Sequence, residues 1–243
     1  MNPLTDDLQF ANRLADAARA VILPHFRRQL TVTDKGAVHF DPVTEADRGA
    51  ETAMRALLKR ERPLDGILGE EYGEVTSVSG RAWVLDPIDG TRSFISGQPL
   101  WGTLIALEDG GKPILGLIDQ PVTGERFVGV GGETFRYAGG EKSALHVRPC
   151  AGVAEAAVMT THPWDYFDAV EESAFNHVAH AARMSRFGGD CTSYALLAAG
   201  FVDLIVEAQL HPWDIAALIP VVEGAGGIVT DWAGGPCANG GRV

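Results

Sequence analysis

The stretch Trp83-Val-Leu-Asp86-Pro87-Ile88-Asp89-Gly90-Thr91 places two carboxylates three residues apart at the end of an apolar run. We expect this run to be a strand that stops and turns here, because Pro87 has no amide donor and Asp89-Gly90 favours a tight turn. Carboxylates at the carboxyl end of a strand lie where open α/β sheets bind ligands. Oxygen donors without Cys or His suit a hard cation such as Mg²⁺, which also bridges to phosphate. The alternative is a plain surface turn.

Three further acidic segments have matching contexts. Gly66-Ile-Leu-Gly69-Glu70-Glu71 is a second apolar strand that ends in carboxylates, and Trp213-Asp214 opens another apolar segment. Asp47, in Val43-Thr44-Glu45-Ala46-Asp47, precedes a run with apolar residues at helical spacing. Taken singly, Asp47 could be a helix N-cap and Asp214 a first-turn acid favoured by the helix dipole.

Taken together and in this order, the four segments resemble the inositol monophosphatase superfamily of magnesium-dependent phosphatases. The resemblance covers nearly the whole chain. It implies that Glu70, Asp86 and the carbonyl of Ile88 hold one Mg²⁺, and that Asp86, Asp89 and Asp214 hold a second. Asp86 would then bridge the two ions, and Glu70 could help to hold a third.

The same resemblance implies the catalytic and phosphate-binding residues. Asp47 and Thr91 would orient the attacking water, with Glu70 contributing through the third ion. Gly90 and Thr91 would donate backbone amides to the phosphate, which agrees with anion binding where a turn leads into a helix. In a two-metal scheme one ion lowers the pKa of a bound water and the other stabilises the leaving oxygen.

The segment that contains Asp190 and Glu207 points to the substrate. By register with the family, Asp190 lies near the organic part of the substrate, and Glu207 aligns with another substrate-contacting acid. Two carboxylates favour a cationic partner, so we expect an amine or imidazolium on the substrate. Alternatively, Asp190 is a helix N-cap after Gly188-Gly189, and Glu207 is a surface acid at a strand end. Arg92 could reach the phosphate or counter the charge of the acids, or it could simply be exposed.

Several runs look most like the histidinol-phosphatase branch of the superfamily. They are Phe187-Gly-Gly-Asp-Cys191, the run from Gly90 to Leu107, and Asp119-Gln-Pro-Val122. The resemblance therefore implies hydrolysis of L-histidinol phosphate in histidine biosynthesis. The alternatives are an inositol-1-phosphatase, a broader sugar-phosphate phosphatase, or a non-catalytic binding protein on the same fold.

Composition narrows the class of protein. The 243 residues include 32 acidic and 20 basic ones, a formal charge of −12, so an acidic pocket would repel phosphate unless bound cations reverse its charge. A pI near 4.9 without a basic cluster argues against nucleic-acid binding. Three widely separated cysteines predict reduced thiols. We expect a cytoplasmic protein with no membrane span or signal peptide, and the resemblance implies a homodimer.

Hydrophobic spacing predicts a mixed α and β chain. We expect Thr5 to cap the first helix and Pro220 to kink the last one. Gly139-Gly140 is expected to mark a boundary between two subdomains of about 1–140 and 141–243. The active site is expected to lie in the crevice between these subdomains. The family resemblance implies one domain with a five-layer α-β-α-β-α sandwich. Family members usually continue beyond the position that corresponds to Val243, so we expect the carboxyl terminus of this chain to be shortened or altered. We expect helices over 6–26, after Asp47, near 167–183, near 192–199 and after Asp214, and strands over 100–107, 113–118, 126–130, 203–206 and 228–230.

Two kinds of ring are also candidates for the site. Trp101 and Tyr194 could flank a substrate ring, although single aromatic residues more often belong to the core. His177 and His180 are three apart on an expected helix, but no third metal ligand follows them at a diagnostic spacing, so a helix surface is the better interpretation.

Overall fold

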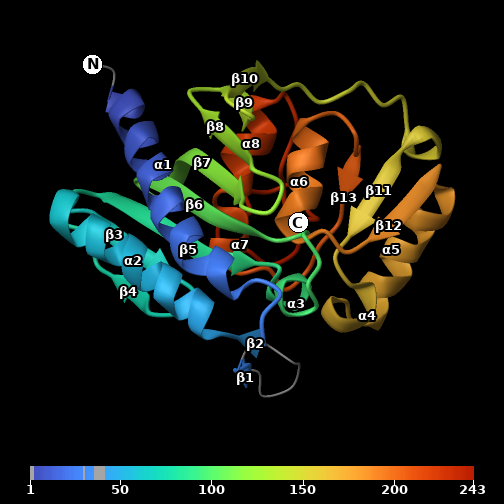
Figure 1. Ribbon diagram of the computed structural model, residues 1–243. Coiled ribbons are helices and arrows are strands. Elements are labelled where there is room, and N and C mark those ends of the chain that lie inside the picture. The colour runs from blue at the N-terminus through green and yellow to red at the C-terminus, as the bar shows by residue number, and fades with distance from the viewer. Residues whose placement is uncertain (1–2, 30, 36–41) are drawn as a thin grey trace.

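An eight-stranded mixed sheet lies at the centre of a computed structural model that describes residues 3–29, 31–35 and 42–243 (Figure 1). Its strand order is β10-β9-β8-β7-β6-β5-β3-β4, and of the described pairs within this sheet only β3–β5 is parallel. Glycine pairs at positive φ, such as Gly110-Gly111, make tight hairpin turns between these strands. The strands are β3 (Gly66–Gly69), β4 (Gly73–Val75), β5 (Arg81–Asp89), β6 (Gly102–Asp109), β7 (Lys112–Gln120), β8 (Glu125–Val130), β9 (Glu133–Ala138) and β10 (Glu141–Ala144).

Two long helices, α1 (Pro3–Ile22) and α2 (Glu45–Glu61), cover one face of this sheet (Figure 1). The small residues of α1 are buried, which lets it pack closely on α2 and on β6 and β7. The helix begins at Pro3, so Thr5 lies inside it and the predicted cap is wrong. It ends at Ile22 and continues as a 3₁₀ turn, η1 (Leu23–His25), because Pro24 has no amide to extend the α-helical bonding.

On the other face, α6 (Asp190–Ala198) and α8 (Leu218–Gly224) pack against the sheet (Figure 1). The approach is close, because a Cβ on Gly116 of β7 would lie 1.9 Å from the carbonyl oxygen of Ala217. The predicted kink at Pro220 is wrong. The chain instead breaks between α7 (Pro212–Ile215) and α8, and Pro220 lies in the first turn of α8, where its missing amide costs nothing.

A second, three-stranded parallel sheet follows on the far side of α6, in the order β12-β11-β13. Helix α5 covers its outer face (Figure 1). The layers therefore run α1/α2, large sheet, α6/α8, small sheet, α5, which confirms the five-layer α-β-α-β-α sandwich. The elements of this half are β11 (Ala157–Thr160), α4 (Pro163–Tyr166), α5 (Ala169–Ala181), β12 (Met184–Phe187) and β13 (Leu204–Ile205), and the remaining short elements are β1 (Thr33–Asp34), β2 (Pro42–Val43), α3 (Thr91–Ile95) and η2 (Val153–Glu155).

The strand expected at 228–230 is wrong. This segment follows the turn at Gly226, pairs with none of the three sheets in the described part of the chain, and leaves Ile228 85% exposed. Gly139-Gly140 forms the hairpin turn between β9 and β10, so the chain leaves the large sheet only after Ala144, and the division into subdomains stays a prediction. None of the described helices is long and apolar enough to cross a membrane. All three cysteines are free.

Candidate active site

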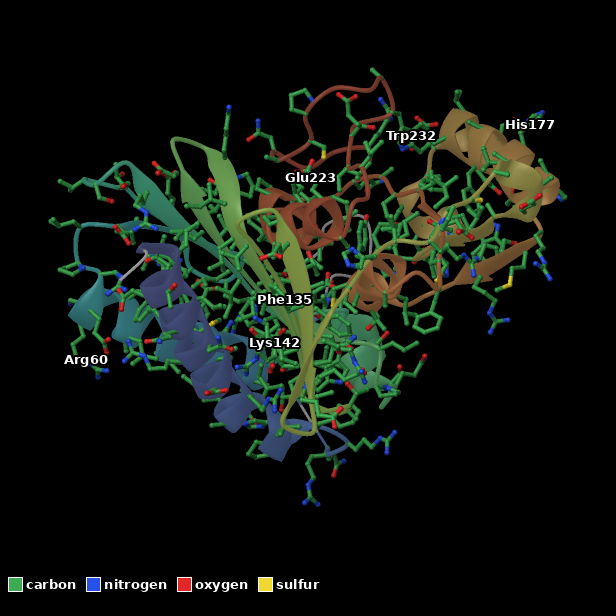
Figure 2. All side chains as sticks on the ribbon, turned by 90° about the horizontal axis from the view of Figure 1, so that it is seen from above. Arg60, Phe135, Lys142, His177, Glu223 and Trp232 are labelled. Atoms are coloured by element: carbon green, nitrogen blue, oxygen red, sulfur yellow. The ribbon has the colours of Figure 1, made fainter. Side chains whose placement is uncertain are left out.

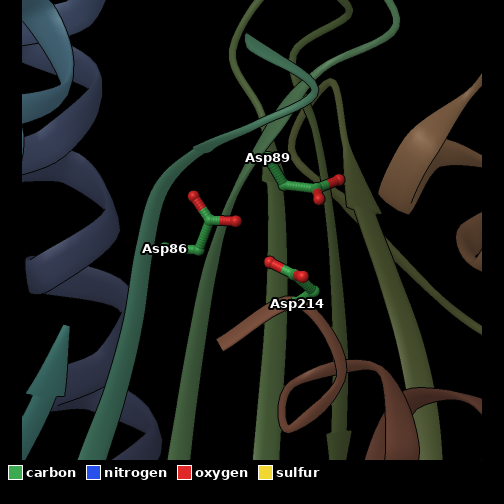
Figure 3. Close-up of side chains that lie close together, drawn as sticks. All are labelled: Asp86, Asp89 and Asp214. Atoms are coloured by element: carbon green, nitrogen blue, oxygen red, sulfur yellow. The ribbon is translucent and has the colours of Figure 1, made fainter. Parts of the chain in front are cut away.

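Three aspartates meet where β5 ends. Asp86 and Asp89 lie on that strand, whose pairing with β6 shifts register between them, and Asp214 faces them from α7. As expected, β5 ends at Asp89 and the chain turns at Gly90. Pro87 lies within the strand, where proline is tolerated because the ladder is irregular. One oxygen from each of the three side chains lies within 4.8 Å of the other two. Figure 3 shows the three carboxylates close together, with Asp214 brought from a distant part of the chain to Asp86 and Asp89.

The environment of this cluster disfavours negative charge. Asp86 is buried, and its Oδ1 has no hydrogen-bond partner in the described ranges. Burial, followed by the charges of Glu70, Asp89 and Asp214, raises the pKa of Asp86 well above its ordinary value. Burial also raises the pKa of Asp89 to about 6, although the amide of Cys191 donates to it at 2.6 Å. A bound cation would relieve this repulsion and give the orphaned oxygen a partner.

Glu70 lies beside the cluster but is not one of its three residues. Its side chain is close enough to raise the pKa of Asp86. Its Oε1 accepts a hydrogen bond from Lys35 Nζ at 2.9 Å, and the same ammonium donates to Glu71 at 2.7 Å. Burial opposes the charge of Lys35, but these two glutamates raise its pKa above the ordinary value. No motif in the sequence indicates Lys35 as a site residue, because its approach depends on tertiary packing.

Asp47 takes part in a helix cap, but it is not the capping residue. Thr44 is the N-cap of α2, and its backbone amide and Oγ1 donate to Asp47 Oδ2 at 2.9 and 2.6 Å, so the predicted N-cap is wrong by three residues. Burial raises the pKa of Asp47 to about 6. Thr91, two residues after Asp89, donates a hydrogen bond from its Oγ1 to the carbonyl of Ile88 at 2.9 Å.

Apart from Asp47, all the predicted metal, catalytic and substrate-binding residues line one cavity of about 670 Å³. The ring candidate Tyr194 also lines it, together with Lys35, Thr161, Tyr166, Gln209, His211 and Trp213. No sequence motif indicated Lys35, Thr161, Tyr166 or Gln209. A second cavity, of about 890 Å³, is mainly apolar and is lined by none of the predicted metal, catalytic or substrate-binding residues, although Tyr194 lines both cavities. The first cavity is therefore the candidate active site, and the roles of its residues stay predictions.

Asp190 and Glu207 lie in this cavity as buried acids. Gly189 is the N-cap of α6, so Asp190 is not the predicted cap; its carboxylate accepts a hydrogen bond from Ser93 at 3.1 Å. Burial and the charge of Asp89 raise the pKa of Asp190 to about 7. Glu207 is 2% exposed, which excludes the surface alternative. Burial raises its pKa to about 8, although the amide and Oγ1 of Thr161 each donate to it at 2.9 Å.

Arg92 reaches across the cavity to the second half of the chain. Its guanidinium pairs with Asp165 of α4 and lies 5.3 Å from the ring centroid of Tyr166. The side chain of Arg92 is 31% exposed, so the alternative that Arg92 is simply an exposed residue is wrong. The contact ties α3, directly after the Asp-Gly-Thr turn, to α4 beside the small sheet.

The ring candidates divide between site and core. Trp101 packs in the core against Phe26 and Phe94 and does not line the cavity, whereas Tyr194 does. His211 also lines the cavity and stacks on Trp213, with centroids 4.8 Å apart.

His177 and His180 are surface residues of α5. Each Nδ1 lies within hydrogen-bond distance of a backbone carbonyl four residues earlier in the chain. Figure 2 shows His177 on a helix at the edge of the molecule. This arrangement agrees with the helix-surface interpretation.

Comparisons of this chain with a family model, with known proteins and with solved structures agree on one family. A model of the inositol monophosphatase family matches residues 4–242. The chloroplastic bifunctional phosphatase IMPL2 of Arabidopsis thaliana is 46% identical over 225 residues, 92% of this chain, and this chain spans only 63% of that protein's length. The histidinol-phosphatase of Chlorobaculum parvum is 40% identical over 95% of this chain and 88% of its own. A solved structure of an inositol monophosphatase from Zymomonas mobilis has a TM-score of 0.87 at 46% identity, covering 100% of this chain and 92% of that one. The chain belongs to the inositol monophosphatase family.

Proposed function

We propose that this protein is a Mg²⁺-dependent phosphomonoesterase that hydrolyses L-histidinol phosphate to L-histidinol and phosphate. The observation that carries the proposal is one cavity in which an aspartate cluster and two further buried carboxylates, Asp190 and Glu207, occur together. Histidinol phosphate has a phosphate at one end and an ammonium and an imidazole at the other. The likeness to a histidinol-phosphatase supports the same assignment.

The donor set suits Mg²⁺. Asp86, Asp89 and Asp214 supply oxygen atoms alone, and the unpartnered Oδ1 of Asp86 is available to a cation. We propose that these three residues hold the metal together with Glu70 and the carbonyl of Ile88. Bound Mg²⁺ would supply a Lewis acid that activates water and offsets the charge of the phosphate.

The chain's own groups would bind and orient the reactants. We assign the backbone amides of Gly90 and Thr91 to the phosphate, because Gly90, at φ 86°, turns the chain from β5 into α3 beside the aspartates. We assign Asp47 and Thr91 to the orientation of water. Asp47 is buried in the first turn of α2, near Glu70, where an anchored carboxylate could accept a proton of the water.

Specificity would come from Asp190 and Glu207. The raised pKa values of Asp190 and Glu207, about 7 and about 8, mean that burial in the cavity disfavours the ionised form of each side chain. An ammonium or imidazolium would compensate for that cost through a charge-assisted hydrogen bond, whereas a neutral polyol would not. Arg92 would act beside the phosphate, held by Asp165.

The second candidate is an inositol-1-phosphatase or a broader sugar-phosphate phosphatase, because the matching Zymomonas structure is described as an inositol monophosphatase and the Arabidopsis relative as bifunctional. A non-catalytic binding protein on this fold is the alternative from another class. A cytoplasmic location and a homodimer belong to the proposal as predictions.

The test is phosphate release from L-histidinol phosphate and from inositol 1-phosphate, side by side, with Mg²⁺ and with chelator. We expect kcat/KM to favour histidinol phosphate by about a hundredfold or more, roughly 2.7 kcal/mol at the transition state. Similar rates on both substrates would support the generalist. Absence of Mg²⁺-dependent release from either would support the binding protein.

A further inference from the structure

Glu51 is a fully buried acid that points into the turn that carries Glu70. It lies on α2, one helical turn after Asp47 and on the same buried face. Its Oε2 accepts the backbone amide of Glu71 at 2.8 Å, and its Oε1 accepts that of Tyr72 at 3.2 Å. Arg55, four residues later on the helix, donates to Oε1 at 2.7 Å. One carboxylate thus binds two consecutive amides that directly follow a predicted metal ligand.

The glycine before Glu70 makes room for this contact. A Cβ on Gly69 would lie 2.1 Å from Glu51 Oε1, well inside van der Waals contact. The Gly69-Glu70-Glu71 motif therefore combines a predicted ligand with the space that an anchoring carboxylate needs. Arg55 strengthens the anchor, because its Nη2 donates to the carbonyl of Gly73 on the same turn.

The backbone of Glu70 is fixed from the other side by the large sheet. Its amide donates to the carbonyl of Leu85 at 3.2 Å, and Leu85 directly precedes Asp86 on β5. The turn is thus held between β5 and α2, with Glu70 at the junction. Groups that fix the orientation of a metal ligand typically affect affinity for the metal as well.

We propose that Glu51 is a positioning residue that holds Glu70 in place for the metal beside Asp86. The inference rests on the proposed Mg²⁺ site but not on the identity of the substrate. A purely structural role for Glu51 would change the stability of the fold without changing the affinity for Mg²⁺. The two roles are therefore separated by a binding measurement on folded protein.

The experiment is calorimetric titration of Mg²⁺ into wild type, Glu51→Gln and Glu61→Gln, with thermal unfolding in chelator as the measure of stability. Glu61 is the matched control, since it is an acid on the same helix, paired with Arg13 at the surface. We expect Glu51→Gln to raise the Kd for Mg²⁺ by roughly 10- to 100-fold, and Glu61→Gln to leave it unchanged. A wild-type Kd in folded Glu51→Gln would overturn the inference, as would a wild type that binds no Mg²⁺.

Two further variants make the result specific. Gly69→Ala pushes the ends of the Glu51 and Arg55 side chains and no backbone atom, so it should fold and weaken Mg²⁺ binding in the same way even if Glu51→Gln does not fold; an unchanged Kd would overturn the proposal. In a Glu70→Gln background, Glu51→Gln should add no further loss, whereas a full additional loss would show that Glu51 does not act through Glu70. Because every readout is binding, failure to hydrolyse histidinol phosphate would contradict the proposed function alone.

Discussion

Ionisation of Glu207 should destabilise the metal-free protein, and Glu207→Gln should remove that part of the pH dependence. Burial raises the pKa of Glu207 from its ordinary value of 4.5 to about 8, against the opposing hydrogen bonds from Thr161. Between these two pH values the folded state binds more protons than the unfolded state. This contribution to stability is therefore fully present below pH 4.5 and is lost as the pH rises toward 8.

The expected size follows from the same shift. One pKa unit corresponds to about 1.4 kcal/mol, so ionised Glu207 should cost the folded state about 4 kcal/mol between pH 5 and pH 8.5. In Glu207→Gln the side chain keeps an oxygen that can accept the amide of Thr161, and it carries no charge. The variant should therefore gain about 4 kcal/mol relative to wild type over this range.

Urea unfolding in chelator, followed by circular dichroism at pH 5, 6.5 and 8.5 and constant ionic strength, measures this difference. Glu74→Gln is the control, because Glu74 is an exposed acid on β4. Asp89 and Asp190 also have raised pKa values, so wild type and variant should both keep some pH dependence. Parallel profiles for wild type and Glu207→Gln would refute the reasoning.

Two further substitutions test the metal cluster and the core separately. Asp214→Asn should lower kcat by about a hundredfold or more, because a charged metal ligand is lost. The Asn side chain can still accept a hydrogen bond from the amide of His211, so the stability of the protein in chelator should be unchanged. A near-normal kcat would contradict the assignment of Asp214 as a metal ligand. Asp119→Ala should cost about 3 to 5 kcal/mol in urea unfolding, because Asp119 is fully buried and pairs with Arg19 and Arg126. Since Asp119 does not line the cavity, the kcat of the folded fraction should be unchanged, and a loss of stability below about 1 kcal/mol would contradict the buried-pair argument.

The parts of the fold that depend on local sequence were predicted well. Apolar runs separated by glycine pairs indicated the antiparallel strands, and helical spacing indicated α1 and α5. Errors occurred where tertiary pairing decides the outcome. The apolar residues at 228–230 have no strand to pair with in the described part of the chain, and Pro220 was accommodated by a new helix start before it.

The candidate site divides in the same way. The acidic segments were visible because each directly follows an apolar run or opens a helix, and the structure brings their carboxylates to one cavity apart from Asp47. Lys35 and Glu51 were missed, because each acts through a contact distant in sequence. Helical periodicity offered a signal for Glu51, since it lies four residues after Asp47 and faces the same side of α2.

The central claim is that buried carboxylates recognise the cationic part of the substrate. The most direct measurement is the effect of Asp190→Asn on the KM values for L-histidinol phosphate and inositol 1-phosphate. We predict that KM for L-histidinol phosphate rises about tenfold or more, a loss of about 1.4 kcal/mol, because the amide cannot pair with an ammonium as a carboxylate does. KM for inositol 1-phosphate should change little, because that substrate carries no cation. Equal changes in both KM values would contradict the claim.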